Sequence, residues 1–588
     1  MKRKSIPSGL EIDVPETAPT ILIVGGVAGG ASAAARARRM NEEARIIIFE
    51  RDSYVSFANC GLPYYLGGEI TDRDALLIAK PALFKRRFDI EVRTRHLVTG
   101  IDRGTKSLTV TDLDAESSYE MGYDKLILAP GADPIVPPIP GAEAAGVYTL
   151  RNLEDTDRIA EAMPDAQRAV VVGGGYIGLE SAEQFRRRGL DVALVEMQPQ
   201  VLPMHDPEMV EPLHRQLEFN GVRLELGNGI AAIEEQHGRA TAAVLADGTR
   251  LPADLVLLGI GVRPNVDLAT EAGIELGESR GIATDALMRT SDPDVYAVGD
   301  AAEYTYGPTG AKLRVPLAGP ANRTGRLAGE HAATGSSREA PAAWGTSIVR
   351  VFGTAAGMTG LSLKAARAAG YEAVATHIIA NNHAGYYPGA QAMIVKLVFE
   401  EGTGKVLGVQ ATGGEGVDKR LDVASTLLHF GGTVHDLAEL DLAYAPPFGS
   451  AKDPLHMAAF AAQNHLDGLA PVVQPDIDLC PYQTLDVRSA AEVEALPLAD
   501  CDDIINIPLD KLRDRIDELD PSLPTIVACR SGLRSYVATR ILKQHGFGEV
   551  YNLSGATAMR EFALNRRQPA AYTTTASGVP KPDAIMID

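Results

Sequence analysis

The chain has 588 residues, 45% of them hydrophobic and 23% charged, and this globular composition excludes disorder as the dominant state. Its 77 acidic and 56 basic residues give a net charge of −21, which argues against nucleic acid as a partner. Four cysteines exclude a disulfide scaffold. Because the chain has neither a signal-peptide core nor an apolar run of about 18 residues, we expect a cytoplasmic protein with no membrane span.

Residues 21–50 and 169–196 share one pattern. Each begins with an apolar strand, continues through a Gly-rich turn and a helix, and ends with a second apolar strand closed by glutamate. This is the βαβ unit with the dinucleotide fingerprint, in which glycines let the backbone approach a pyrophosphate at the helix N-terminus. Glu50 and Glu196 would then accept hydrogen bonds from ribose hydroxyls. A ligand-free unit, whose glycines serve only close packing, is the alternative.

Shorter elements follow along the chain. We expect apolar strands at 125–129 and 255–262, a strand within 290–303 that ends at Gly299-Asp300, and a further α/β segment at 341–466. A linker containing Gly and Pro at 466–478 precedes short parallel-type strands within 484–489, 503–509 and 525–535.

With YAVGD ending at Asp300, residues 20–466 resemble the flavin-dependent pyridine-nucleotide–disulfide oxidoreductases. That family holds FAD in the first βαβ unit and NAD(P)H in the second. The resemblance implies that Asp300 bonds the ribityl chain of FAD, although on local grounds it could equally cap a turn. The implied fold class is α/β, with two Rossmann-like domains that bind FAD and NAD, an α/β dimerisation domain and a C-terminal α/β domain.

The expected domains have these boundaries: an N-terminal tail at 1–18, the FAD-binding domain at 19–145 and 265–340, the NAD-binding domain at 146–264, the dimerisation domain at 341–466, a linker at 467–474, the C-terminal α/β domain at 475–565 and a flexible tail at 566–588.

The resemblance also implies the cofactor contacts. For FAD these are Gly25, Val27, Ala28, Gly29, Gly30, Glu50, Arg51, Ala129, Gly131, Asp300, Pro316, Leu317 and Ala318. For NAD they are Gly173, Gly175, Tyr176, Ile177, Gly178, Glu196 and Gly261. Because a carboxylate at Glu196 accepts the 2′-hydroxyl of NADH and repels the 2′-phosphate of NADPH, we expect NADH to be preferred.

The stretch YVSFANCGLPYYLGGEI, residues 54–70, carries a single cysteine, Cys60. Glutathione-reductase-like members have a Cys-x4-Cys pair here. A lone thiol cannot form an internal disulfide, but it can cycle as a thiolate, sulfenic acid, persulfide or mixed disulfide. The following Gly-Leu-Pro predicts a helix start, whose dipole would lower the pKa of the thiol. A buried structural cysteine is the alternative.

Within the family, SFANCGLPYY most resembles the coenzyme A-disulfide reductases. The runner-up is the NADH oxidase and peroxidase branch, whose peroxide-reducing members carry a histidine where Ala28 stands. NNHAGYYPGA (381–390) and LAYAPPFGSAKDP (442–454) resemble stretches whose tyrosines reach the active site of the partner subunit in a homodimer. Tyr444 and one of Tyr386 and Tyr387 would then protonate the leaving coenzyme A (CoA) thiolate. The alternative is that these tyrosines only pack in the core or at an interface, which is the more common role of aromatic side chains.

CoA carries phosphates, so a CoA site requires cations. Arg39 and Ser56 correspond to CoA-contacting positions of the family. Further CoA candidates are Asn59, Lys80 and Arg323.

Residues 475–565 resemble a rhodanese domain through LDVRS, INIPL, CRSGLRS and VYNLSGA. Cys529 would head an anion-binding loop, with Arg530 and Arg534 adding positive charge, and would carry sulfane sulfur. The Cys-x4-Arg spacing favours sulfur over phosphate. Cys480 and Cys501 lie outside the motifs and are assigned structural roles, and no Cys/His cluster has metal-ligand spacing.

The sequence thus predicts an FAD-dependent enzyme that uses NADH to reduce CoA disulfide, CoA persulfide or polysulfide through Cys60, with sulfur transfer at Cys529. An NADH oxidase is one alternative. A redox-regulated binding module, with an idle reductase, is the other.

Overall fold

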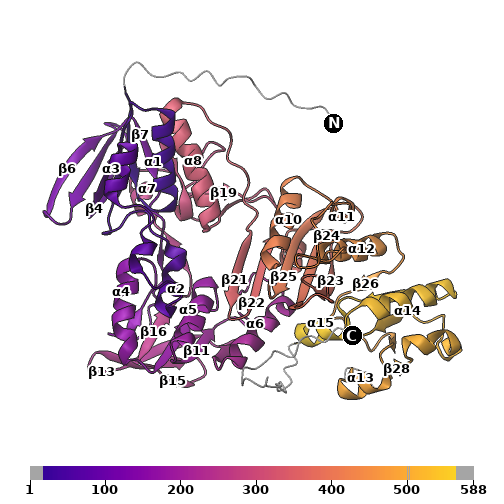
Figure 1. The fold of residues 1–588 in the computed structure, drawn as a ribbon. Coiled ribbons are helices and arrows are strands. Elements are labelled where there is room, and N and C mark those ends of the chain that lie inside the picture. The colour runs from indigo at the N-terminus through magenta and orange to yellow at the C-terminus, as the bar shows by residue number, and fades with distance from the viewer. Residues whose placement is uncertain (1–17, 499–500, 502, 565–588) are drawn as a thin grey trace.

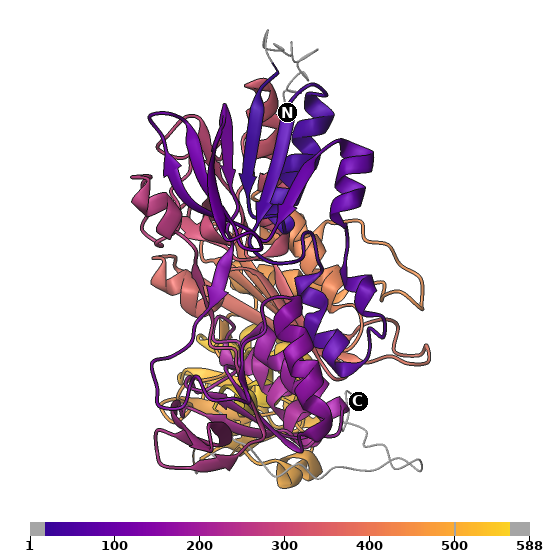
Figure 2. The same cartoon turned by 90° about the vertical axis from the view of Figure 1, so that its left-hand side faces the viewer.

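The computed structural model describes residues 18–498, 501 and 503–564. The tails expected at 1–18 and 566–588 therefore lie outside the described residues, except for Ala18. Four sheet-based bodies follow one another in Figure 1, from the indigo N-terminal body to the yellow C-terminal one. The rotated view in Figure 2 places the first body at one end of the molecule and the C-terminal body toward the other.

The first body is a parallel five-stranded sheet in the order β18-β7-β1-β2-β3. Its strands are β1 (Thr20–Val24), β2 (Arg45–Glu50), β3 (Glu91–Thr94), β7 (Lys125–Leu128) and β18 (Val295–Ala297). Its interior is apolar: Ile21, Leu22 and Ile23 are fully buried. An antiparallel sheet of β4 (His96–Asp102), β5 (Ser107–Asp112) and β6 (Ser117–Gly122) is attached to it.

Helices α1 (Ala28–Met40) and α8 (Ala318–Thr334) pack side by side on this sheet (Figure 1). Glycine makes the close approach possible, since a Cβ on Gly325 would lie 2.3 Å from the carbonyl oxygen of Gly29. The same body contains α3 (Pro81–Phe88), α7 (Asp267–Glu271), η4 (Gly299–Ala301), β19 (Glu303–Thr305) and β20 (Lys312–Arg314). The segment after β2 also forms η1 (Asn59–Gly61), α2 (Leu62–Gly67) and η2 (Arg73–Leu76), and the buried side chains of α2 and η2 pack against the second body.

The second body repeats the architecture, with a parallel sheet in the order β12-β11-β10-β16-β9. Its strands are β9 (Val147–Tyr148), β10 (Arg168–Val172), β11 (Asp191–Glu196), β12 (Arg223–Leu226) and β16 (Leu255–Leu258). Its helices are α4 (Leu153–Ala162), η3 (Met163–Asp165), α5 (Tyr176–Arg187) and α6 (Pro207–Phe219), and a small sheet adds β13 (Ile230–Gln236), β14 (Arg239–Leu245) and β15 (Arg250–Pro252). The antiparallel pair β8 (Ala132–Pro134) and β17 (Val262–Pro264) joins it to the first body.

The third body is an antiparallel sheet in the order β21-β22-β25-β24-β23, so β23 is an edge strand. The strands are β21 (Ser347–Val351), β22 (Thr354–Gly360), β23 (Ala373–Asn381), β24 (Ala392–Glu400) and β25 (Val406–Gly413). The helices are α9 (Leu363–Ala368), α10 (Val417–His429), α11 (Val434–Ala438) and α12 (Pro454–Leu466).

The C-terminal body is a parallel sheet in the order β26-β30-β29-β27-β28. It comprises β26 (Val472–Val473), β27 (Gln483–Asp486), β28 (Ile505–Asn506), β29 (Thr525–Ala528) and β30 (Val550–Leu553), with α13 (Ala490–Ala495), η5 (Leu509–Asp514), η6 (Ile516–Glu518), α14 (Leu533–Gln544) and α15 (Ala556–Ala563). The predicted α/β class is therefore confirmed. Among the described residues, no helix combines the length and apolar character that crossing a membrane requires.

Candidate functional site

The first Gly-rich turn forms a tight cradle between β1 and α1. Gly25 has φ of +92°, and a Cβ there would lie 2.1 Å from the carbonyl oxygen of Ala129. A Cβ on Gly30 would lie 1.9 Å from the oxygen of Gly25. No side chain fits at either position, so the turn before α1 requires glycine at Gly25 and Gly30. Such a cradle fits the pyrophosphate of a dinucleotide such as FAD.

The predicted ribose acceptor, Glu50, ends β2 beside this turn. Its Oε2 accepts the N–H of Gly26 at 2.8 Å, and its Oε1 accepts the N–H of Asp52 at 3.0 Å. Burial raises the pKa of Glu50, against the opposing effect of these two bonds. The neighbouring Arg51 pairs with Asp133 at 2.5 Å.

Asp300 lies in η4, close to the same turn. A Cβ on Gly29 would lie 3.5 Å from the backbone nitrogen of Gly299. Burial raises the pKa of Asp300, and the charges of Arg151 and Arg314 oppose the shift. The remaining predicted FAD positions flank the turns and helix starts: Val27 and Ala28 at α1, Ala129 and Gly131 after β7, and Pro316, Leu317 and Ala318 at α8.

The second Gly-rich turn repeats the cradle with one difference. Gly173 has φ of +110°, and its Cβ would lie 2.3 Å from the oxygen of Gly259. Gly175 precedes α5 and has open space where its Cβ would be, whereas Val27 stands at the equivalent place before α1. Glu196 Oε2 accepts the N–H of Gly174 at 2.7 Å, as Glu50 does in the first unit.

Other predicted NAD positions surround this turn. Tyr176 begins α5, and its hydroxyl donates to Ser347 Oγ at 2.6 Å. Ile177 is 40% exposed, and a Cβ on Gly178 would lie 1.9 Å from the oxygen of Gly173. Gly261 has φ of +120°.

Cys60 is exposed and lies in η1, immediately before α2. Its N–H donates to Asn59 Oδ1 at 3.1 Å. The loop before it is tied to the first Gly-rich turn, because the Ser56 N–H donates to the carbonyl of Gly26 at 2.9 Å. The lone thiol therefore adjoins the first dinucleotide cradle.

The expectation that a helix dipole lowers the pKa of Cys60 is wrong. The protein atoms around the thiol partly desolvate it, and the carboxylates of Glu180 and Asp300 add negative charge, so its pKa is raised. Helix α2 has only six residues, so it contributes little opposing field.

A polar group close to Cys60 was not expected from the sequence. The Tyr64 hydroxyl, one turn beyond Cys60, donates to Glu180 Oε1 on α5 at 2.9 Å. The guanidinium of Arg350 lies 5.4 Å from the centre of the Tyr64 ring. Burial raises the pKa of Glu180 to about 6, against the effect of the Tyr64 bond. The available signal was Glu180 itself, an acid in the first turns of the helix after the second Gly-rich turn.

The predicted CoA residues do not form one compact cluster. Arg39 is exposed at the last turn of α1, with its guanidinium 5.4 Å from the centre of the Phe88 ring. Arg323 is exposed on the first turns of α8, which runs parallel to α1. The register places these residues at opposite ends of the helix pair, so only an extended ligand would reach both. Lys80 pairs with Asp74 at 2.7 Å, and Asn59 is exposed next to Cys60.

Tyr386 and Tyr387 lie in a turn after β23. The hydroxyls of Tyr386 and Tyr444 are 3.1 Å apart, and Tyr387 instead packs edge-on against His383. Both members of the pair are exposed, Tyr386 by 77% and Tyr444 by 49%.

Cys529 is buried and directly follows β29, at the start of the loop that leads into α14. Its Sγ accepts the N–H of Gly532 at 3.0 Å and lies 3.3 Å from Ser535 Oγ. An inward N–H stabilises a thiolate or persulfide. The positive charge that Arg534 was expected to add to this loop is partly neutralised, because Arg534 makes two hydrogen bonds to the carboxylate of Glu492, at 2.6 and 2.8 Å. Arg530 keeps a buried Nε without a hydrogen-bond partner.

Cys480 and Cys501 form a disulfide with Cα atoms 5.6 Å apart. Asp478 lies close enough to share a metal ion with them, but the two sulfurs are bonded to each other. The pairing leaves Cys60 and Cys529 as the free thiols.

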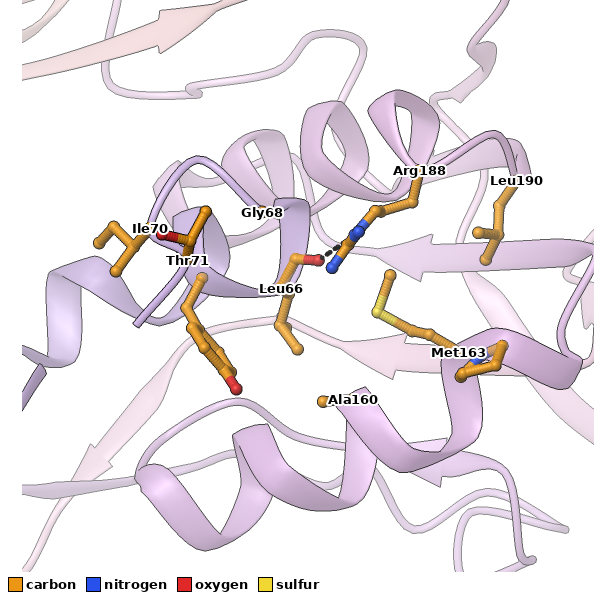
Figure 3. A pocket seen from close by; sticks show the side chains of 10 residues that line it. Leu66, Gly68, Ile70, Thr71, Ala160, Met163, Arg188 and Leu190 are labelled. Atoms are coloured by element: carbon orange, nitrogen blue, oxygen red, sulfur yellow. Dashed lines mark hydrogen bonds between the residues drawn. The ribbon is translucent and has the colours of Figure 1, made fainter. Parts of the chain in front are cut away.

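A cavity of about 450 Å³ lies between α2, α4 and α5. Figure 3 shows Leu66, Met163 and Leu190 around it, with Arg188 donating to the Leu66 carbonyl at 2.9 Å. None of the predicted site residues lines this cavity.

Three sequence families match the chain. The pyridine nucleotide-disulphide oxidoreductase family matches residues 19–325, its dimerisation domain matches 346–454, and the rhodanese-like domain matches 472–558. The described cradles thus lie in segments that match a family implying FAD and NAD(P)H.

Solved structures extend the match to most of the chain. The reduced CoADR-RHD of Bacillus anthracis is 41% identical with a TM-score of 0.90, covering 94% of this chain and 99% of that one. An NAD-dependent persulfide reductase from A. fulgidus is 38% identical with a TM-score of 0.85, covering 92% and 99%.

Curated relatives match about three quarters of the chain. Coenzyme A disulfide reductase from Staphylococcus haemolyticus is 32% identical over 76% of this chain and 99% of its own length. An NADH oxidase from Methanocaldococcus jannaschii is 34% identical over 74% and 97%.

Proposed function

The chain belongs to the pyridine nucleotide-disulphide oxidoreductase family, and on that premise we propose that it reduces CoA disulfide or CoA persulfide with NADH. The rhodanese domain transfers sulfane sulfur at Cys529, and Cys60 is the redox thiol. The chain resembles, over nearly all of its length, one protein described as CoADR-RHD and one described as a persulfide reductase.

The proposal rests on the observation that Cys60 has no second cysteine with which to form an internal disulfide. Cys480 and Cys501 are paired with each other, and Cys529 is buried in another domain. Cys60 therefore has no partner for an internal disulfide, and its redox partner is a sulfur of the substrate. The Cys60 thiolate attacks CoA disulfide, forms a mixed disulfide and releases one CoA thiolate. Two electrons and a proton from NADH return Cys60 to the thiolate and release the second CoA as thiol, and a further proton converts the first CoA thiolate to the thiol.

FAD bound in the first cradle would supply the two-electron link between NADH and Cys60. The residues fit it: Gly25 and Gly30 keep the backbone open, Glu50 bonds the N–H of Gly26 in the same turn, and Gly299, which precedes Asp300, lies beside Gly29. In the second unit, Glu196 supports NADH over NADPH, because none of Met197 to Gln200 offers a cation for a 2′-phosphate.

CoA persulfide follows the same chemistry. Attack of the Cys60 thiolate on its inner sulfur gives the same mixed disulfide and releases hydrosulfide. Arg39, Lys80 and Arg323 supply cations for the CoA phosphates, and Ser56 and Asn59 line the approach to Cys60.

The proton for the departing CoA thiolate comes from a second subunit. The chain carries the dimerisation domain of its family, and the hydroxyls of Tyr386 and Tyr444 are exposed and 3.1 Å apart. A homodimer would bring this pair to the partner's Cys60. Tyr386, whose hydroxyl meets Tyr444, is a better donor than Tyr387.

The test replaces Cys60 by Ser. NADH-dependent release of CoA thiol from CoA disulfide, and of sulfide from CoA persulfide, should fall by at least about a thousandfold, while bound FAD keeps its visible absorbance. The matched control is Cys529→Ser, which leaves turnover of CoA disulfide unchanged. Undiminished turnover in the Cys60 variant would refute the mechanism.

Oxygen reduction is the second candidate, since a relative is named NADH oxidase. Ala28 stands where peroxide-reducing members carry a histidine, so that proton donor is missing. Anaerobic assays with and without CoA persulfide separate the two activities. NADH consumption that needs oxygen and ignores the sulfur substrate would favour the oxidase.

A further inference from the structure

The C-terminal domain is fixed to the third body through the edge strand β23. Ser554 Oγ accepts the backbone N–H of His377 at 3.0 Å, and Gln474 Nε2 donates to the carbonyl of Ala375 at 2.9 Å. An edge strand presents unpaired N–H and C=O groups, and here two side chains from the C-terminal part of the chain satisfy them. Gly555 adds a close approach, because a Cβ there would lie 2.9 Å from His377 Cβ.

The imidazole ring of His377 forms a second hydrogen bond with the Ser554 hydroxyl. His377 Nδ1 lies 2.8 Å from Ser554 Oγ, and Nε2 lies 3.0 Å from Glu208 Oε1. Burial lowers the pKa of His377, so the ring is neutral. A carboxylate only accepts, so Nε2 carries the proton and Nδ1 accepts the Ser554 hydroxyl. The Ser554 hydroxyl thus accepts a hydrogen bond from the backbone N–H of His377 and donates one to its imidazole ring.

Glu208 is itself held in place. Lys396, the cross-strand neighbour of His377, contacts both Glu208 and Asp206, and all of these groups are buried. Burial opposes ionisation of Glu208, but the charge of Lys396 and the His377 bond hold its pKa below the ordinary value. The orientation of the His377 ring is therefore set by the rigid start of α6.

The segment that contains Ser554 also supports the Cys529 loop. The N–H groups of Thr557 and Ala558 donate to the carbonyls of Cys529 and Arg530, both at 3.1 Å. Asn552 Oδ1 accepts the hydroxyl of Ser535 at 2.6 Å, and that hydroxyl lies 3.3 Å from the Cys529 sulfur. Residues 552–558 are thus bonded to the sulfur-carrying loop on one side and to His377 on the other.

Apolar packing prevents this segment from shifting independently. Met559 and Phe562 of α15 form one buried cluster with Met209 of α6 and Ile394 of β24. The guanidinium of Arg215 lies 4.5 Å from the centre of the Phe562 ring. Figure 1 shows α15 beside α6.

We propose that His377, in the third body, is a positioning residue for sulfur transfer at Cys529, acting through Ser554 and residues 552–558. The inference rests on the sulfur-transfer part of the proposed function. It assigns a role to the VYNLSGA motif, whose Ser554 and Gly555 form the contact with His377.

The probe reaction uses thiosulfate as donor and cyanide as acceptor. The Cys529 thiolate takes the outer sulfur of thiosulfate, which forms a persulfide and releases sulfite. Cyanide then removes that sulfur as thiocyanate and restores the thiolate. No outside oxidant or reductant is needed.

Ser554→Ala should lower kcat for thiocyanate formation about tenfold, with KM for thiosulfate within about twofold, because the loop still binds the anion but the sulfur is misdirected. The rate of Cys529 alkylation by iodoacetamide should change as well. The control is Thr376→Val, which removes another buried β23 hydroxyl contact, from Thr376 to the Ala458 carbonyl at 3.2 Å. That variant should keep both rates, and NADH-dependent turnover should be unchanged in both variants.

Two substitutions of His377 separate positioning from folding. An Asn amide replaces Nδ1 and keeps a partner for Ser554, whereas a Gln amide replaces Nε2 and keeps only the bond to Glu208. His377→Asn should retain thiocyanate formation within about threefold, and His377→Gln should lose it as Ser554→Ala does. Equal activity in these two variants, or an unaffected Ser554→Ala, would overturn the inference. A wild-type protein without thiocyanate formation would instead contradict the proposed sulfur transfer itself.

Discussion

The hydroxyl of Tyr64 donates a hydrogen bond of 2.9 Å to the carboxylate of Glu180, although 116 residues separate the two in sequence. The bond joins the short helix after Cys60 to the helix that begins at the second dinucleotide cradle. It places a carboxyl whose pKa is about 6 where its charge raises the pKa of the Cys60 thiol. The reactivity of Cys60 should therefore depend on the state of Glu180.

Replacing Glu180 by Gln should make Cys60 more reactive. Above about pH 6 the Glu180 carboxylate is charged and disfavours the thiolate. Its removal should speed alkylation of Cys60 by iodoacetamide up to about tenfold at about pH 7.5. Below about pH 6 the native carboxyl is also neutral, so the advantage should disappear. Glu235→Gln, at an exposed site of the same domain, is the control. Equal rates across the pH range would contradict this electrostatic role.

The two paired tyrosines should matter more than their neighbour. Tyr386→Phe and Tyr444→Phe should each lower kcat for CoA disulfide about tenfold, because the pair would protonate the departing thiolate. Tyr387→Phe is the matched control, since Tyr387 packs on His383 instead. Steady-state assays at saturating NADH measure the effect. A larger loss in the Tyr387 variant than in the others would reverse the assignment.

Gly175→Ala should separate nucleotide binding from folding. A Cβ at Gly175 meets no protein atom within 4 Å, so the variant should fold, but the methyl group would stand where the pyrophosphate approaches. We expect KM for NADH to rise at least about tenfold with unchanged FAD content. Gly353→Ala, also in open space, should change neither. An unaltered KM in the Gly175 variant would exclude this turn as the NADH site.

The Glu492–Arg534 pair should stabilise the rhodanese domain in a pH-dependent way. The Arg534 hydrogen bonds lower the pKa of Glu492 to about 2, from an ordinary value of 4.5. Because the folded-state pKa is depressed, the stabilisation is present above about pH 4.5 and is lost as the pH falls toward 2. Both side chains are about one third exposed, so the contribution is at most about 1 kcal/mol.

Melting curves test this pair. Glu492→Gln should lower the Tm of the rhodanese transition by a few degrees at about pH 7, and the difference should shrink below about pH 4.5. Glu494→Gln, on the same helix and exposed, is the control. A Tm difference between Glu492→Gln and the wild type that stays constant or grows as the pH falls would contradict this prediction.

The Cys480–Cys501 disulfide should stabilise the same domain. It closes a segment with a sequence separation of 21, for which chain entropy predicts about 3 kcal/mol. Cys501→Ser should therefore lower the Tm of the oxidised protein, and dithiothreitol should lower the Tm of the wild type to the level of the variant. Thiol titration of the denatured protein before and after reduction counts the free thiols. Four titratable thiols without reductant would show that the bond is absent.

Local motifs were predictable because their chemistry resides in consecutive residues. The backbone requirement at Gly25 and Gly173, and the carboxylates that close each unit, follow from the order of residues along one βαβ turn. The single thiol at Cys60 and the loop at Cys529 are equally local. The family comparison confirmed the fold class and the reductase–rhodanese assignment that these motifs predicted.

Contacts between distant segments were not predictable in the same way. The sequence showed neither Glu180 beside Cys60, nor Glu492 on Arg534, nor the bond between Cys480 and Cys501. The helix start after Cys60 was recognised, but its effect on the thiol was assigned the wrong sign because nearby carboxylates from other elements were unknown.

The sequence by itself therefore predicted the groups proposed to carry the chemistry: two dinucleotide turns, the thiol of Cys60 and the loop at Cys529. Only the tertiary structure decided the electrostatic surroundings of those groups and the attachment of the rhodanese loop to His377 through Ser554. The physical reason is the distance along the sequence over which each property is set. Backbone conformation in a turn depends on neighbours in sequence, whereas desolvation, charge and hydrogen-bond pairing depend on residues that folding brings together from elsewhere in the chain.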